Sequence, residues 1–148
     1  PVKNLLLLLF LLLAMPVSAA QLRGTIFLVP NNGPYCYLFE TDGMLKFNVN
    51  GIASAGAAFD SVKARIANEG GTIVKVQFNV TKGASQILAA LRPTAVNGPW
   101  AYTCEVDGAW KTVVNNVANV AAGADAIKAL VGAEPGSFVK GTITVITQ

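Results

Sequence analysis

The chain has 148 residues, of which 53% are hydrophobic and 13% charged, and its formal net charge at pH 7 is +3. Its lysines and arginines are scattered, so the dense basic patch typical of nucleic-acid binding is missing and we regard such binding as unlikely. The chain has no histidine, which removes most catalytic triads and most zinc sites. We therefore expect a protein that is not an enzyme and that holds neither a metal nor a cofactor.

Residues 1–20 have the pattern of a secretory signal peptide. A basic start is followed by an almost unbroken run of leucines from Leu5 to Ala14 and then by small residues. Ser18 and Ala20 fit the −3 and −1 positions, which predicts cleavage between Ala20 and Gln21, and cleavage after Ala19 fits nearly as well. The alternative is a retained hydrophobic N-terminal helix, although the run is short for crossing ~30 Å of hydrocarbon. We expect a secreted, periplasmic or cell-surface protein that contacts a membrane only through residues 1–20, if these remain uncleaved.

The chain from Gln21 onward predicts three strands, a helix and a fourth strand. Leu45, Phe47 and Val49 alternate with polar residues, as in a half-buried strand. Asp42-Gly43 is a tight-turn signal, because both residue types tolerate positive φ. The predicted strands cover residues 21–29, 35–40, 45–50 and 72–80, and the predicted helix covers residues 57–68.

The segment from Asn97 to Val145 repeats the segment from Asn32 to Val80 at a constant offset of 65 positions (97 − 32), without a gap. We interpret this as a tandem duplication, with one β-rich repeat over 21–83 and a second over 84–148. The identities include Tyr37/Tyr102, Glu40/Glu105, Asp42/Asp107, Gly43/Gly108, Lys46/Lys111, Asp60/Asp125, Lys63/Lys128, Glu69/Glu134 and Lys75/Lys140.

The second half predicts the same order of elements. The composition of residues 84–91 favours a helix, but the matching positions of the first half read as a strand, so we assign a strand. Further strands are predicted at 100–105, 110–115 and 137–147, and a helix at 121–131. The predicted fold class is therefore β-rich α+β, with two tandem βββαβ repeats that form either two small barrels or one shared pseudo-twofold sheet.

This order of elements resembles the oligonucleotide/oligosaccharide-binding (OB) barrel, and the first half is similar to a cold-shock domain of that fold. The likeness is carried by Gly24-Thr25-Ile26, by Tyr35-Cys36-Tyr37 and by the spacing to Asp42-Gly43. It implies that Tyr35 and Tyr37, and Trp100 and Tyr102 in the second half, are stacking residues. The aromatics of the family's first strand are absent, and fold alone does not carry function.

Cys36 and Cys104 are the only cysteines. An even pair in an exported protein is most simply one disulfide. If the second strands of the two halves met antiparallel about a pseudo-dyad, Cys36 would oppose Cys104. The sequence therefore predicts a Cys36–Cys104 disulfide, conditional on that arrangement.

The aromatic residues are the candidates for contact with a ligand or partner: Tyr35, Tyr37, Trp100, Tyr102 and Trp110. Aromatics left exposed would form a stacking platform for an extracellular glycan or a protein. We expect an exported, non-enzymatic binding or surface-structural protein. The alternative is a subunit of a filament or envelope assembly, a homo-oligomer in which the hydrophobic N-terminal segment is retained and buried between protomers.

Overall fold

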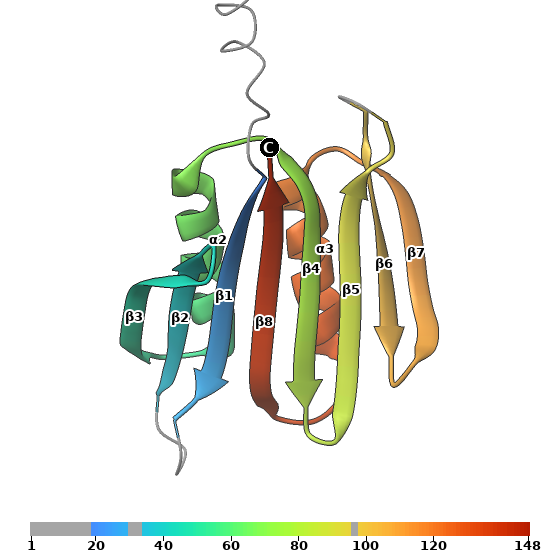
Figure 1. Cartoon of the computed structure of the whole chain (residues 1–148). Coiled ribbons are helices and arrows are strands. Elements are labelled where there is room, and N and C mark those ends of the chain that lie inside the picture. Colours follow the sequence, from blue (N-terminus) through green and yellow to red (C-terminus); the bar gives the residue numbers. More distant parts are fainter. Residues whose placement is uncertain (1–18, 30–33, 96–97) are drawn as a thin grey trace, which may run out of the picture.

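The computed structural model describes residues 19–29, 34–95 and 98–148. The predicted signal peptide lies almost entirely outside these residues, whereas Ala20 and Gln21 begin the first strand. The described part of the chain forms eight antiparallel strands and two helices (Figure 1), which confirms the predicted β-rich α+β class. No helix in these residues is long and apolar enough to cross a membrane.

The elements follow the predicted order closely, and the disputed segment at 84–91 is indeed a strand. In chain order they are β1 (Ala20–Leu28), β2 (Tyr35–Thr41), β3 (Met44–Ile52), α2 (Ala55–Glu69), β4 (Ile73–Lys82), β5 (Ser85–Pro93), β6 (Trp100–Val106), β7 (Ala109–Val117), α3 (Val120–Ala133) and β8 (Phe138–Thr147).

All eight strands belong to one open sheet, in the order β3-β2-β1-β8-β4-β5-β6-β7. The last strand of each half is exchanged: β8 pairs with β1 of the first half, and β4 pairs with β5 of the second. β4 and β8 also pair with each other at the centre. Because neither fourth strand returns to its own half, the sheet does not close. Of the two predicted arrangements, the OB-like barrels are therefore wrong, and the strands of both halves share one sheet.

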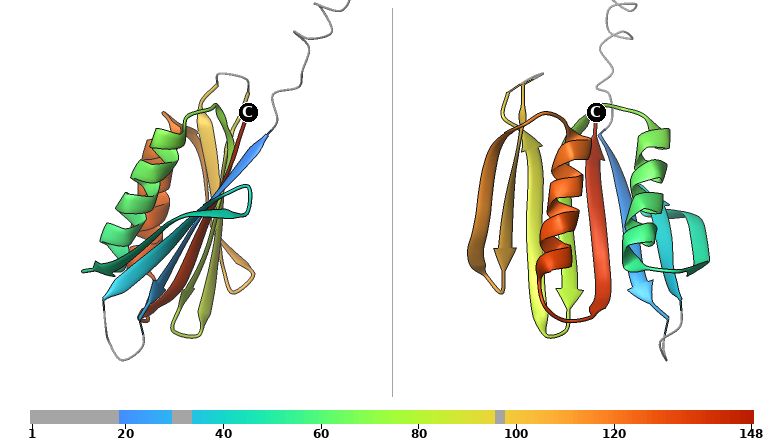
Figure 2. Two further views of the ribbon diagram at one scale, coloured as in Figure 1. Left: turned by 60° about the vertical axis from the view of Figure 1, so that its left-hand side comes forward. Right: turned by 180° about the vertical axis from the view of Figure 1, so that it is seen from behind.

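Both helices cover the same face of the sheet (Figure 2). Helix α2 buries Ala58, Val62 and Ile66, and helix α3 buries Gly123, Ala124 and Ile127. These small and branched residues pack on an apolar sheet face that includes Leu22, Ile26, Phe39, Phe78, Ile87, Leu91 and Val145. The opposite face of the central strands carries polar residues such as Gln77 and Thr144, in agreement with the two-residue period of each strand.

The helix caps and the hairpin turns of the first half recur 65 positions later in the second half. Ser54 and Asn119 cap the two helices by accepting hydrogen bonds from Ala57 N (3.1 Å) and Ala122 N (2.8 Å). At the two hairpin turns, Asp42 and Asp107 have φ of 50° and 52°. Their Oδ1 atoms accept hydrogen bonds from the backbone N of Gln21 and of Gln86, each at 2.8 Å. The Asp-Gly turns are therefore anchored to the neighbouring strand as well as to their own hairpin.

Helix and sheet approach closely at two glycines. A Cβ atom at Gly24 of β1 would overlap the side chain of Val62, and one at Gly123 of α3 would overlap Leu91. The counterparts of these glycines are Ala89 and Ala58, both buried. A larger residue on one layer thus faces a smaller residue on the other, as dense core packing requires.

Candidate functional site

An apolar groove runs between α2 and α3, with β8 and β4 as its floor; the view from behind shows the two helices side by side over the sheet (Figure 2). One end of the groove holds a cavity of ≈ 200 Å³ beside the start of α2 and the end of α3. Its apolar lining includes Ile26, Phe59, Phe78, Ile127, Val131 and Phe138. We call this space the larger cavity.

A smaller cavity of ≈ 110 Å³ occupies the other end of the groove, beside the end of α2 and the start of α3. Phe59, Phe78 and Ile143 border both cavities, so the two are adjacent. Most lining positions of the larger cavity have a counterpart 65 positions away in the smaller one. These pairs are Ala55/Val120, Gly56/Ala121, Phe59/Ala124, Phe78/Ile143, Ile143/Phe78, Val80/Val145, Lys128/Lys63, Val131/Ile66, Gly132/Ala67, Phe138/Ile73 and Gly141/Val76.

Two reciprocal ion pairs join the helices above the groove. Lys63 Nζ lies 2.6 Å from Asp125 Oδ1, and Lys128 Nζ lies 2.7 Å from Asp60 Oδ1 and 2.8 Å from its Oδ2. Position 60 pairs with 128 and 63 with 125, as expected for antiparallel helices. All four side chains are partly exposed, so each pair contributes only about 0.2–1 kcal/mol. In each pair the lysine charge is cancelled by an aspartate, so the groove has no net charge above it.

Lys82, at the end of β4, also lines the larger cavity and is buried. Its ammonium group donates hydrogen bonds to the carbonyl oxygens of Val131 (2.9 Å), Gly132 (3.2 Å) and Glu134 at the end of α3. A cation at a helix C-terminus is favourable because the last carbonyls lack partners and carry partial negative charge. A lysine from the first half therefore caps the C-terminal end of the helix in the second half.

The predicted contact aromatics do not come together as one platform. Tyr37 and Tyr102 are buried in the core, and Arg65 Nε lies 3.4 Å from the Tyr37 hydroxyl oxygen. Tyr35 is half-buried, with its ring edge-to-face on Phe138 at a centroid distance of 5.7 Å. Trp100 is half-buried at the start of β6, and Trp110, on edge strand β7, is 66% exposed. The two aromatic sets lie on β2 and on β6–β7, separated by the four central strands.

The predicted Cys36–Cys104 disulfide is wrong for this fold, in which both cysteines are free. β2 and β6 do not pair; they lie five strand spacings apart, which corresponds to about 24 Å. Cys104 belongs to the core beneath the helices, whereas Cys36 precedes buried Tyr37 and points to the other sheet face. The assumed symmetry axis lay between β2 and β6, but the halves are related about the β4–β8 boundary.

The two thiols lack the surroundings of a reactive cysteine. Burial raises the pKa of the Cys36 thiol above its ordinary value. The pKa of Cys104 is also raised, first by burial and then by the nearby carboxylate of Glu134. A raised pKa keeps each sulfur protonated near neutral pH, and the thiol form is a poor nucleophile. Neither sulfur therefore has the thiolate form that nucleophilic catalysis or disulfide exchange requires.

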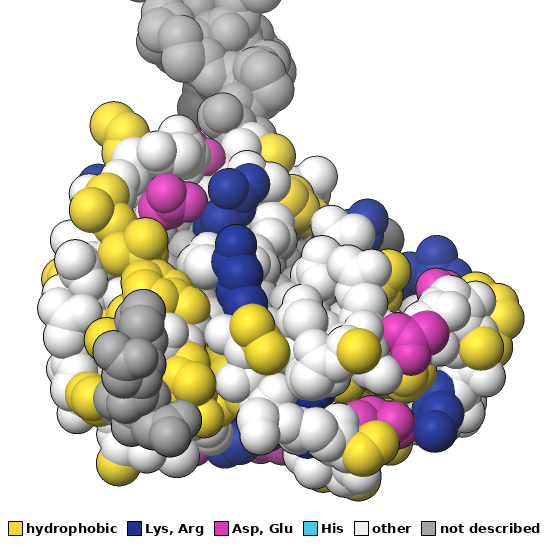
Figure 3. Space-filling view, turned by 90° about the horizontal axis from the view of Figure 1, so that it is seen from below, with side chains coloured by type: hydrophobic (Ala, Val, Ile, Leu, Met, Phe, Trp, Pro, Cys, Tyr) yellow, Lys and Arg dark blue, Asp and Glu magenta, His cyan; other side chains and the backbone are white. Residues whose placement is uncertain are grey.

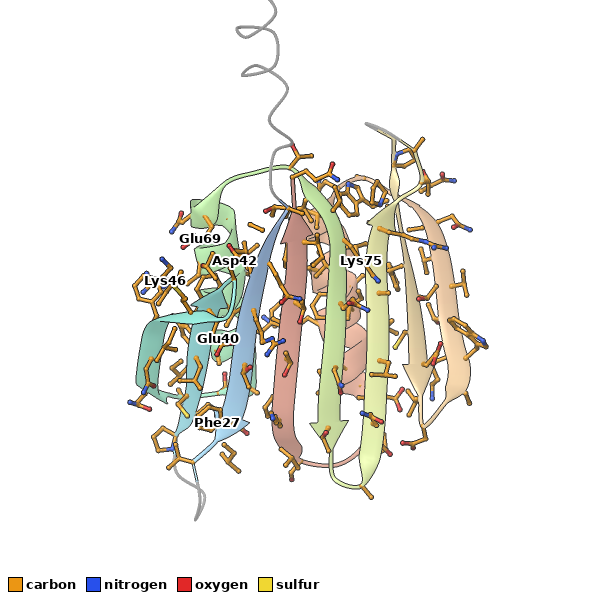
Figure 4. All side chains as sticks on the ribbon, in the orientation of Figure 1. Phe27, Glu40, Asp42, Lys46, Glu69 and Lys75 are labelled. Atoms are coloured by element: carbon orange, nitrogen blue, oxygen red, sulfur yellow. The ribbon has the colours of Figure 1, made fainter. Side chains whose placement is uncertain are left out.

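Charged side chains outside the groove do not gather into a site. Within residues 19–29, 34–95 and 98–148, no three or more His, Cys, Asp or Glu side chains are placed to hold a metal ion. Glu40 and Asp42 lie at the end of β2, far across the sheet from Lys75 on β4 (Figure 4). Seen from the end with the β4–β5 turn, acidic and basic side chains are interspersed (Figure 3).

No protein-family model, no curated protein and no solved structure matches the chain. The interhelical groove is distinguished by an almost wholly apolar lining, which suits a small apolar molecule. Sequence reasoning missed it because Phe59, Phe78 and Phe138 look like ordinary core residues. The available signal was the pair of identities Asp60/Asp125 and Lys63/Lys128, which puts one aspartate and one lysine on each predicted helix.

Proposed function

We propose that this is an exported, non-enzymatic binding protein that arose by tandem duplication and takes a small apolar ligand in the larger cavity. The observation that carries the proposal is an apolar space of ≈ 200 Å³ between the helices. An apolar cavity of ~150 Å³ is enough to hold benzene. Lining of this kind favours a ligand through burial of its surface, worth about 0.8 kcal/mol per CH₂ group.

The duplication explains why the groove lies where it does. Each helix packs mainly on the strands of its own half. The exchanged strands β4 and β8 separate those two sets of strands and so hold the helices apart. The space between the helices is therefore a product of joining two halves, and it is lined by residues of both. Ligand sites commonly occupy such junctions.

Binding is tested by titrating the protein with naphthalene, a neutral apolar probe, and following amide shifts by NMR. Gly56→Leu should fill the larger cavity, since a Cβ atom at Gly56 meets Lys128 Cε at an ordinary 3.6 Å. The matched control is Ala121→Leu, at the counterpart position beside the smaller cavity. We expect Kd to rise at least tenfold in Gly56→Leu and to stay unchanged in Ala121→Leu. No binding to the natural sequence, or equal binding to both variants, contradicts the proposal.

Export is proposed from the sequence pattern of residues 1–20, and it has its own test. The backbone N of Gln21 lies 2.8 Å from Asp42 Oδ1. Cleavage before Gln21 would turn this amide into a charged α-amino group, which would form a stronger, charge-assisted hydrogen bond with the carboxylate. The intact mass of protein from its native source should therefore begin at Gln21. A mass that still includes residues 1–20 would contradict the signal-peptide interpretation.

A second candidate function is a subunit of a filament or envelope assembly, favoured by the exposed apolar side chains on both edge strands. Met44 and Leu45 on β3 are 62% and 57% exposed, and Trp110 and Val113 on β7 are 66% and 61% exposed. Because β3 and β7 run in opposite directions, β7 of one copy could pair antiparallel with β3 of the next. Such head-to-tail contacts produce open filaments.

We rank assembly second because both edges carry features that oppose pairing. The β2–β3 and β6–β7 ladders contain register shifts, and lysines occupy both edge strands. Light scattering separates the two candidates. Assembly predicts a concentration-dependent mass that falls in Leu45→Lys and in Trp110→Lys. A constant monomer mass would exclude edge pairing under those conditions and leave ligand binding unaffected.

A further inference from the structure

Three side chains border both cavities, and only one of them, Phe59, comes from a helix. Phe59 lines both cavities and is only half-buried, with its ring stacked on Phe78 at a centroid distance of 5.9 Å. Its counterpart is Ala124, which lines the smaller cavity and projects a single methyl group. At the boundary between the two cavities, helix α2 therefore places an aromatic ring where helix α3 has only a methyl group.

Phe59 is held by contacts that a ligand could replace. Its stacking partner Phe78 belongs to β4, and Lys128 Nζ lies 5.6 Å from the centre of its ring. Both the ring stacking and the cation–π contact are weak at a partly exposed position, so a ligand can replace them. A half-buried aromatic side chain with such contacts can change rotamer, and the space beside Ala124 would then join the larger cavity.

The charges around the groove indicate a ligand without net charge. Lys63 and Lys128 are each neutralised by an aspartate of the opposite helix. The ammonium of Lys82 is occupied by three carbonyl groups, whose own partial charge offsets it. A charged ligand group would lose its hydration without gaining a free partner, which is unfavourable in an apolar site.

We propose that the ligand is a neutral, unbranched hydrocarbon chain with at most a hydroxyl-sized head. The chain lies lengthwise beneath the two ion pairs and passes from the larger cavity into the smaller one as the Phe59 ring turns aside. This inference rests on the proposed function, because it specifies the ligand class of the same groove. It differs in requiring both cavities, whereas naphthalene binding requires only the larger one.

The test uses the full chain and straight-chain primary alcohols from pentan-1-ol to decan-1-ol. Isothermal titration should show Kd falling about fourfold for each added CH₂ across the whole series. In Ala121→Leu, which narrows the smaller cavity from an exposed position, the short alcohols should bind as before. The long alcohols should show no further gain in that variant. Methyl NMR shifts at Ala124 should appear only with the long alcohols.

A third protein tests the role of the ring. Phe59→Ala gives position 59 the alanine that its counterpart, position 124, already has, and it removes the ring between the two cavities. Long alcohols should then bind at least threefold more tightly, whereas the Kd of pentan-1-ol should not change. If Kd in the natural sequence stops falling at the same chain length as in Ala121→Leu, the chain inference is overturned. Naphthalene binding would then still stand. If neither naphthalene nor any alcohol binds, the proposed function and this inference are both overturned.

Discussion

The closest approach of helix and sheet offers a sharp test of the packing, through Gly24→Ala. The added methyl would overlap Val62 Cγ1 and lie 2.9 Å from Cγ2. Val62 is fully buried, and a β-branched residue in a helix has essentially one χ1 rotamer, so it cannot rotate away. Gly24 is not among the residues with positive φ, so the cost is steric and not conformational. Overpacking of this kind costs about 1–3 kcal/mol.

The expected result is a loss of about 1–2 kcal/mol in the free energy of unfolding, once the favourable removal of a strand glycine is deducted. Urea titration followed by tryptophan fluorescence measures it. Val62→Ala alone should cost about 2 kcal/mol because it leaves a cavity. In the double variant the new methyl fills that cavity, so the two changes should fall short of additivity by about 1 kcal/mol or more.

The matched control is Gly132→Ala, because a Cβ atom there meets nothing within 4 Å. It should stabilise helix α3 by up to about 1 kcal/mol. The reasoning is refuted if Gly24→Ala is as harmless as Gly132→Ala, or if the effects of Gly24→Ala and Val62→Ala simply add. Either result would mean that α2 does not press on β1 at this point.

Three further predictions concern charges and thiols. Lys82→Met should lower the free energy of unfolding by about 2 kcal/mol in urea titrations, because the carbonyls ending α3 lose a charged donor. A double-mutant cycle of Lys63→Ala and Asp125→Ala should give a coupling of about 0.2–1 kcal/mol that shrinks in 1 M NaCl; a salt-independent coupling would contradict it. Cys36 and Cys104 should react with Ellman's reagent only on unfolding. Burial raises the pKa of both thiols in the folded protein, so the unfolded protein loses these protons first as pH rises. The free energy of unfolding should therefore be unaffected by the thiols below their ordinary pKa of about 8.5 and should fall as pH rises beyond it. A rise in the free energy of unfolding at alkaline pH would contradict the burial of the two thiols.

Local structure was predictable from the sequence because each signal acts over a few residues. The Asp42-Gly43 turn and the alternation of Leu45, Phe47 and Val49 locate their strands without reference to the rest of the chain. The expectation that the strand is half-buried is wrong for Leu45 and Phe47, which are exposed on edge strand β3, where the pairing with β2 is shifted in register. The strand at 85–93 was found by its counterpart, since its own composition favours a helix. The exchange of β4 and β8 carries no local signal, because a strand has the same two-residue period whichever neighbour it pairs with.

The candidate site was hidden for the same reason. Phe59 and Phe138 line the larger cavity, yet nothing in their spacing separates a cavity wall from a filled core. The Cys36–Cys104 prediction failed at the level of strand order, because the argument assumed a symmetry axis that the exchanged strands place elsewhere. Asp60 and Lys63 lie within the predicted helix, but their partners on α3 depend on how the halves meet.

The central position of β8 also affects the timing of folding. β8 is the last strand in the sequence, yet it lies between β1 and β4 and bonds to both. Until residues up to Thr147 are available, β1 and β4 each lack a neighbour, and the sheet remains two separate parts. A nascent chain therefore cannot complete its core step by step. The fully bonded sheet can form only once the last strand has been synthesised.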